Sequence, residues 1–246
     1  LNVKAGYAEY SPEILKEKPN KKYQGNALYH NLRYRFQYRN QVFAGLTAEK
    51  DAGEPFFTKY NRKGYDSYTG YLFLQNLGRL KTLALGHYRA SFGYGLVMNM
   101  GFSMGKSMTL SSMNRKGKGF IKHTSVDEGS YLQGVGATYT LGKRWDLSAC
   151  YSFREMDGNV EDQEKKNSFN NHLIGCNLSY NGKYVEYGLT AVYNHFNKML
   201  NPDYRDYNRY YPRGKNFYNA GVHYKVYMKR FIFSGETAID KQGAVS

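Results

Sequence analysis

Residues 144–154, RWDLSACYSFR, show the pattern that decides the fold of this chain. Every second residue from Trp145 to Phe153 is aromatic or apolar, and the residues between them are charged or small. Strict alternation of this kind places the two sets on opposite faces of a β-strand. The stretch therefore predicts a strand with one apolar face and one polar face.

Three further stretches, residues 28–39, 183–196 and 216–228, repeat this design. In residues 28–39 only His30 interrupts the apolar face. Alternating segments of this kind number about eleven, with the first near Val3 and the last ending near Asp240. The chain has 246 residues and only 5 Pro, and no Pro-rich linker or low-complexity tract divides it. We therefore expect one domain over residues 1–246.

Short and long connections alternate between the expected strands. Short turns rich in Asn and Gly are expected at residues 39–41, 76–79, 141–143, 181–182 and 228–229. Long polar segments are expected at residues 11–22, 50–64, 92–129, 155–168 and 197–215. Outer-membrane β-barrels alternate short turns on one side of the membrane with long loops on the other.

The composition supports a barrel in lipid. Aromatic residues make up 17% of the chain, including 26 Tyr and 14 Phe, although the mean hydropathy is −0.71. A barrel wall faces hydrocarbon outside and water inside, so its strands are half apolar and half polar. A soluble β-sandwich also alternates, but it would usually bury Val, Ile and Leu rather than so many Tyr.

A helical membrane protein is excluded, because a spanning helix needs about 20 consecutive apolar residues and runs such as Leu83-Ala84-Leu85 are far shorter. The sequence thus predicts an all-β, antiparallel transmembrane β-barrel of the outer-membrane type, with about 11–12 or more strands. Because bacterial single-chain barrels have even strand numbers, we also expect a barrel incomplete at its C-terminus, as in a fragment of a longer protein.

Three blocks of the sequence carry a resemblance to a known family: residues 86–98 (GHYRASFGYGLVM), residues 101–107 (GFSMGKS) and residues 233–238 (FSGETA). They resemble the barrel region of outer-membrane proteins of the Bacteroides phylum that carry helix-hairpin-helix (competence-protein-like) repeats. The resemblance implies a bacterial outer-membrane location and hints at DNA uptake. The repeats themselves are absent from this sequence, so a DNA-handling role would lack its binding module.

Basic residues on predicted inward faces point to a polar lumen, because a charge facing lipid is costly. The lumen-facing candidates are Arg33, Arg35, Arg39, Arg144 and Arg154. They would favour anion passage or binding. Alternatively, they only pair with the inward acidic residues Glu49, Asp146, Glu186 and Glu236.

The chain carries 35 Lys and Arg against 20 Asp and Glu, a formal charge of +15. Such an excess suggests an anionic partner, either lipopolysaccharide or nucleic acid; a solvated polar surface is the alternative. The anion-binding candidates lie in the longest loop and are Lys106, Arg115, Lys116, Lys118 and Lys122.

Closely spaced glycines in the same region permit a tight chain path. Gly93, Gly95, Gly101 and Gly105 are therefore candidates for a loop folded into the lumen as a plug or constriction. A flexible external loop is the alternative. The spacing of Gly101 and Gly105 does not match a phosphate-binding Walker loop.

No catalytic or metal-binding constellation stands out. Residues 101–105 (GFSMG) fit the short Gly-x-Ser-x-Gly pattern, but the Ser and His residues are scattered along the sequence and no Ser–His or Asp–His pair stands out. Methionines between Met98 and Met113 suit apolar packing better than Cu(I) binding. Cys150 and Cys176 fall on opposite predicted faces, so we expect two free thiols.

We therefore expect no enzyme and no cofactor, but a pore or the membrane anchor of an uptake or surface assembly. Its expected partners are outer-membrane lipid, lipopolysaccharide and other outer-membrane subunits. Two alternatives stay open at this point. One is a barrel enzyme acting on lipid or peptide. The other is a structural or adhesive barrel that binds partners through Tyr-rich loops such as residues 201–211.

Overall fold

The computed structural model describes residues 2–7, 25, 28–58, 61–62, 64–100, 116–125, 129–156, 169–201, 206, 211–243 and 245. Its strands are β1 (Asn2–Tyr7), β2 (Leu28–Tyr38), β3 (Val42–Lys50), β4 (Ser67–Leu77), β5 (Leu80–Ser91), β6 (Gly119–Lys122), β7 (Leu132–Leu141), β8 (Trp145–Met156), β9 (Phe169–Asn181), β10 (Val185–Leu200), β11 (Gly214–Tyr227) and β12 (Ile232–Asp240).

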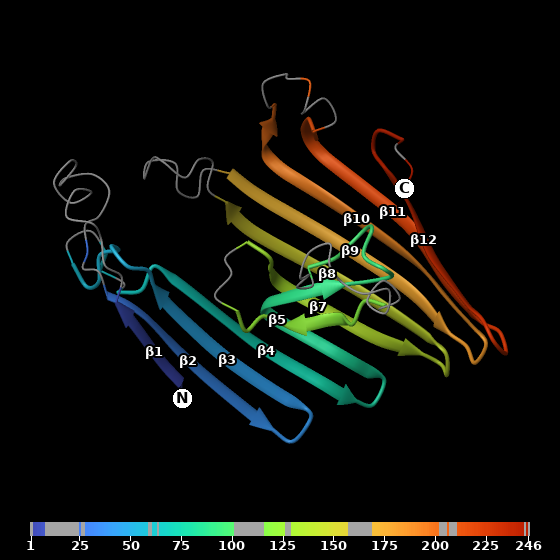
Figure 1. Ribbon diagram of the computed structural model, residues 1–246, viewed down its shortest axis with the longest axis horizontal. Coiled ribbons are helices and arrows are strands. Elements are labelled where there is room, and N and C mark those ends of the chain that lie inside the picture. The colour runs from blue at the N-terminus through green and yellow to red at the C-terminus, as the bar shows by residue number, and fades with distance from the viewer. Residues whose placement is uncertain are drawn as a thin grey trace.

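The strands form one antiparallel sheet in which neighbours in the chain are neighbours in space (Figure 1). Eleven strands follow one another from β1 to β12, and β6 pairs only with β5. The prediction of about eleven antiparallel strands is confirmed. No α-helix occurs among the described residues, and no helix there is long and apolar enough to cross a membrane.

The short turns lie where the sequence predicts them. Asn76, Gly78 and Gly142 adopt positive φ of 58°, 63° and 71°, a conformation that Asn and Gly tolerate best. Arg39 also has a positive φ of 49°, although the adjacent Asn40 is the residue that sequence rules would choose. Gly134, with φ of 153°, lies within β7 and not in a turn.

The sheet is polar on its covered face and apolar on its open face. In β8, Leu147 is 41% exposed and its neighbour Ser148 is 3% exposed; in β10, Leu189 is 52% exposed and Thr190 is 1% exposed. A water-soluble β-protein buries the apolar set of an alternating strand and exposes the polar set. This sheet has the opposite polarity.

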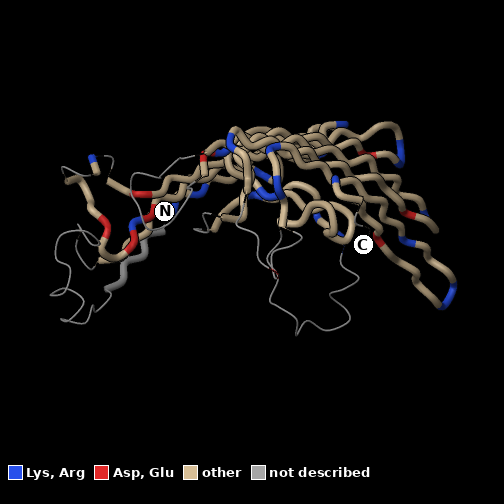
Figure 2. The backbone as a smooth tube through the Cα atoms, turned by 90° about the horizontal axis from the view of Figure 1, so that it is seen from above, with Lys and Arg blue, Asp and Glu red and all other residues tan. Residues whose placement is uncertain are grey.

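The sheet curves into an arch, and part of the chain between β5 and β7 lies inside it (Figure 2). We call the side with Ser148 and Thr190 the concave face and the side with Leu147 and Leu189 the convex face. The path turns inward at Gly86, which has a φ of 85° and would meet the backbone oxygen of Gly70 if it carried a Cβ. Beyond Gly86, the end of β5 pairs with β6.

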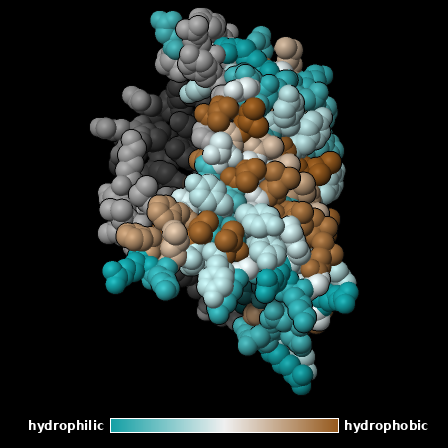
Figure 3. All heavy atoms as spheres, turned by 90° about the vertical axis from the view of Figure 1, so that its right-hand side faces the viewer, coloured by the Kyte–Doolittle hydropathy of each residue, from teal (hydrophilic) through white to brown (hydrophobic). Residues whose placement is uncertain are grey.

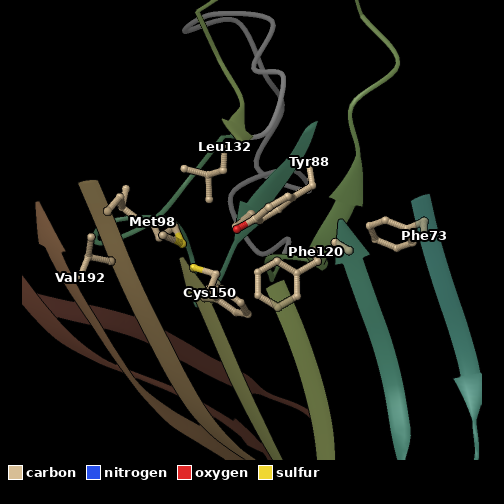
Figure 4. Close-up of a cluster of buried hydrophobic side chains, with 11 residues drawn as sticks. Phe73, Tyr88, Met98, Phe120, Leu132, Cys150 and Val192 are labelled. Atoms are coloured by element: carbon tan, nitrogen blue, oxygen red, sulfur yellow. The ribbon is translucent and has the colours of Figure 1, made fainter. Parts of the chain in front are cut away.

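The buried hydrophobic core fills the middle of the concave face. We call the described residues 92–100 and 116–125, between β5 and β7, the inserted chain. Side chains of β4, β5 and β7–β10 contact Phe92, Met98 and Phe120 of this segment. Tyr88, Phe120 and Cys150 point toward one another in this cluster (Figure 4). The sequence predicted one long polar segment over residues 92–129. This prediction is wrong for Gly119–Lys122, which form β6. A strand of four residues is too short to produce a visible alternation.

β1 and β12 form the two edges of the sheet, and within the described residues they do not pair with each other. The predicted fold is therefore confirmed as an all-β antiparallel sheet with two chemically different faces. Its closure into a barrel stays a prediction.

Candidate functional site

Two features of the molecule are candidates for function: the apolar convex face and the polar concave face around the inserted chain. On the convex face, Trp145, Tyr180, Tyr187 and Tyr224 from β8–β11 lie opposite one another in register, close to the short turns. The rings of Tyr180 and Tyr187 stack with centroids 5.0 Å apart, and Trp145 lies 5.1 Å from Tyr180. These residues form an aromatic row across four strands.

A second row of the same strands lies toward the long loops and consists of Tyr151, Ile174, Tyr193 and Tyr218. The residues between the two rows are aliphatic or small: Leu147, Leu178, Leu189, Val222, Ala149, Cys176, Ala191 and Ala220. Apolar residues gather across the middle of this side of the molecule, with hydrophilic residues at its ends (Figure 3). The convex face thus carries an apolar band bordered by aromatic residues.

On the concave face, Glu236 of β12 holds the chain just after β5. Its Oε2 accepts the backbone N–H groups of Tyr94 at 2.7 Å and Leu96 at 3.0 Å. Gly93 and Gly95 adopt φ of 59° and 97°, and a Cβ on Gly93 would lie 2.6 Å from Oε1 of Glu236. We call this contact the Glu236 latch.

Two ion pairs and an amide form a chain of polar contacts beside the short turns. Lys81 Nζ lies 2.8 Å from Asp146, and Lys116 Nζ lies 2.9 Å from Glu186. Asn181 connects them, because its amide nitrogen donates to Asp146 at 3.0 Å and its oxygen accepts from Lys116 at 3.2 Å. Tyr227 donates to the other oxygen of Glu186 at 2.7 Å. Lys116 thereby ties the inserted chain to β9 and β10.

Polar side chains cover the sheet next to these ion pairs. Thr138 and Ser148 are 2.8 Å apart, and Asn177 donates to Thr190 at 2.8 Å. A cavity of about 240 Å³ lies between this part of the sheet and the inserted chain. Buried polar groups need such partners. The concave face is therefore suited to contact with water or a polar ligand.

Of the five arginines predicted to face the lumen, three lie on the concave face and two lie in turns. Arg33 and Arg35 lie on the concave face of β2, opposite Thr47 and Gly45. Arg154 also lies on that face and donates to the carbonyl oxygens of Gly129 and Tyr131, both at 2.9 Å.

The assignment is wrong for Arg39 and Arg144, which lie in exposed turns. Arg39 lies over the Tyr38 ring at 5.3 Å. Arg144 donates to Tyr180 of the convex aromatic row at 3.0 Å. β2 ends at Tyr38, one residue before Arg39, and β8 begins at Trp145, one residue after Arg144, so neither side chain lies on the inward face of a strand.

The expected pairing of inward acids with arginine is also wrong for Asp146 and Glu186, whose ion-pair partners are lysines. Glu236 accepts backbone N–H groups, and Glu49 accepts the Tyr29 hydroxyl at 2.6 Å.

Of the anion-binding candidates, Lys116, Lys118 and Lys122 belong to the inserted chain, and Lys106 and Arg115 lie outside the described residues. Lys116 is paired with Glu186, and Lys122 Nζ lies 3.6 Å from the centre of the Phe43 ring. Lys118 is exposed and lines the cavity. The three described lysines therefore do not form a free external loop.

Of the plug candidates, Gly93 and Gly95 form the turn held by the Glu236 latch. Gly101 and Gly105 lie outside the described residues. The blocks at residues 86–98 and 233–238, singled out separately in the sequence, meet at this latch.

The described residues hold no group of three or more His, Cys, Asp or Glu suited to a metal ion. Met98 packs in the hydrophobic core. Cys150 is buried and Cys176 is exposed, and both are free thiols as predicted. Most of loop 201–211, the proposed adhesive segment, lies outside the described residues.

The sequence did not predict Lys81 as an ion-pair partner of Asp146, nor the backbone N–H groups of Tyr94 and Leu96 as the donors to Glu236. Both contacts join residues far apart in the sequence, and alternation carries no signal for them. Comparisons with known proteins add no assignment, since no family model, no curated protein and no solved structure matches this chain.

Proposed function

We propose that this chain forms the wall of a bacterial outer-membrane β-barrel and serves as the membrane anchor of an uptake or surface assembly. The observation that carries the proposal is the inverted polarity of the sheet. Exposed apolar residues cover the convex face, and buried polar residues line the concave face. In a membrane barrel the first face would contact lipid and the second would face the lumen.

The dimensions of the apolar band support this proposal. Outward residues of β10 are apolar or aromatic from Val185 to Tyr193. At about 3.3 Å per residue this stretch is about 30 Å long, and a strand tilt of about 40° reduces its height to about 23 Å. The apolar band of outer-membrane barrels is about 25 Å tall and has aromatic residues at both borders.

The filled concave face favours an anchor over a wide open pore. Phe92, Met98 and Phe120 of the inserted chain occupy the space where an open channel would run. We expect little ion conductance from the folded protein in planar bilayers. A role in DNA uptake rests only on the resemblance of the three sequence blocks.

Trp145 is the only tryptophan of the chain and belongs to the aromatic row beside the short turns, so it can test the proposal. We expect its fluorescence in lipid vesicles to be quenched more by bromine near the headgroup end of the lipid chains than by deeper bromine. Trp145→Phe combined with Leu147→Trp should show the reverse order. Trp145→Phe combined with Gln37→Trp, which places the indole on the concave side, should show little quenching. Absence of quenching at both positions 145 and 147 would exclude lipid contact.

A further inference from the structure

The cavity of about 240 Å³ on the concave face lies between two parts of the chain. The sheet contributes Lys81, Asp146 and Asn181, and the inserted chain contributes Lys116, Lys118 and Phe120. Charged and hydrogen-bonding groups thus reach one space from elements distant in the sequence. Such convergence is typical of a ligand site rather than of a packing defect.

Three lysines and one carboxylate, that of Asp146, line this cavity. Asp146 already accepts from Lys81, Thr140 and Asn181, and the Asn181 oxygen accepts from Lys116. An ammonium group carries three donors. Lys81 uses one, on Asp146; Lys116 uses two, on Asn181 and Glu186; and Lys118 has no hydrogen-bonded partner in the described part of the chain. Lys81, with 56% of its side chain exposed, and Lys118 turn their remaining donors to solvent, where an acceptor-rich ligand can replace water.

The charges around the cavity also favour an anionic ligand. Lys81 is paired with Asp146 and Lys116 with Glu186, and among the described residues Lys118 has no ion-pair partner to offset its charge. A phosphate group offers several strong acceptor oxygens and about two negative charges, and lysine ammonium groups bind it as point charges. We propose that this cavity binds the phosphate group of a small molecule no larger than a sugar phosphate. This site differs from polyanion binding by a loop, because the sheet and the inserted chain would contact the ligand from two sides.

Lys118 offers the cleanest test, since it is exposed and its replacement breaks no described contact. Binding of inorganic phosphate and of glucose 6-phosphate would be measured by calorimetry on the full chain folded in detergent micelles at low salt. We expect Lys118→Gln to weaken binding about tenfold and Lys118→Glu to abolish it. Lys229 lies exposed in the turn between β11 and β12, so Lys229→Gln and Lys229→Glu make the same charge changes away from the cavity. They should bind like the wild type.

The readouts separate this proposal from the membrane proposal, because micelle binding does not depend on insertion into a bilayer. Trp145 fluorescence and far-ultraviolet circular dichroism confirm that each variant keeps its fold. Tighter binding of glucose 6-phosphate than of inorganic phosphate would support a sugar-phosphate-sized ligand. Failure of the wild type to bind either probe would overturn the proposal. Equal losses in the Lys118 and Lys229 variants would also overturn it, since they would indicate only general charge attraction.

Discussion

Leu147 and Ser148 are neighbours in β8 whose side chains experience opposite surroundings. Leu147 lies in the exposed apolar band, and Ser148 is buried under the inserted chain, where it forms a hydrogen bond with Thr138. Alternation alone would place Ser148 in an open, water-filled lumen. In the structure Ser148 lines the cavity between the sheet and the inserted chain, so a charged residue at position 148 would alter both the cavity and the hydrogen bond to Thr138.

Leu147→Arg should destabilise the protein in lipid vesicles by about 2–4 kcal/mol, the range for arginine facing lipid near the bilayer centre. Gln37→Arg serves as the matched control, because Gln37 is exposed on the concave side of β2 beside Arg35. Its cost should be below about 1 kcal/mol, as for surface substitutions. Both would be measured by denaturant titration of vesicle-bound protein. Equal costs would show that the convex face does not contact lipid.

Glu54, in the loop between β3 and β4, should make that loop sensitive to pH. Burial raises the pKa of its carboxyl to about 7, and the nearby Asp66 acts in the same direction. A pKa that is higher in the folded state means that protonation stabilises the fold. The contribution is full below the ordinary pKa of about 4.5 and is lost as the pH rises through about 7.

Hydrogen exchange measures this effect at the amides of Glu54 and Asp66, which donate to Asp51 and Glu49. After correction for intrinsic rates, both should be better protected at pH 5 than at pH 8. Glu54→Gln should remove most of the difference, because glutamine stays neutral over this range. An unchanged pH dependence in Glu54→Gln would assign the effect to another group.

The strands and short turns could be predicted from the sequence, but the path of the inserted chain could not. The alternation of residues 144–154 and 183–196 predicts β8 and β10 because one face of each strand has a uniform environment. Beyond Gly86, the contacts of β5 with β6 and of Gly93 with Glu236 depend on tertiary packing. His30 shows the same limit: its ring interrupts an apolar face, and Phe56 and Tyr65 cover it from a distant loop, with centroids 4.6 and 5.0 Å away.

The Glu236 latch should control how firmly the inserted chain is held. Glu236→Ala leaves the N–H groups of Tyr94 and Leu96 without their acceptor, and loss of hydrogen bonds to a charged group costs about 1.5–3 kcal/mol. Hydrogen exchange at these two amides should therefore accelerate about tenfold or more. Glu236→Gln keeps one acceptor oxygen and should give an intermediate rate.

Thr237→Ala is the matched control, because Thr237 is the exposed neighbour of Glu236 on the convex face. It should leave both amides protected as in the wild type. If Glu236→Ala also left them protected, the core contacts of Met98 and Phe120 would be sufficient to hold the inserted chain.

The described part of the molecule is an arch whose edge strands, β1 and β12, do not pair with each other, and this bears on how it would sit in a bilayer. Unpaired backbone N–H and C=O groups in hydrocarbon cost several kcal/mol each. β12 pairs with β11 over Ile232–Asp240. Among the described residues its other edge has no partner strand and is bridged only at Ile239, by Val245. A spanning barrel therefore requires both edges to be paired, either with each other or with further strands of the same protein or of another chain.

This requirement predicts different protection along the sheet when the 246-residue chain is folded alone in micelles. In β9, which pairs with both β8 and β10, amides should be protected at successive residues. In β12, protection should alternate from Ile232 to Thr237, because in this stretch only amides facing β11 have a partner and those on the open edge face detergent or water. Hydrogen exchange resolved at single residues over Ile232–Asp240 measures the pattern. Uniform protection of β12 at the level of β9, at all protein concentrations, would mean that the chain closes its own sheet. Uniform protection that appears only as the concentration rises would instead identify a second copy of the chain as the strand partner.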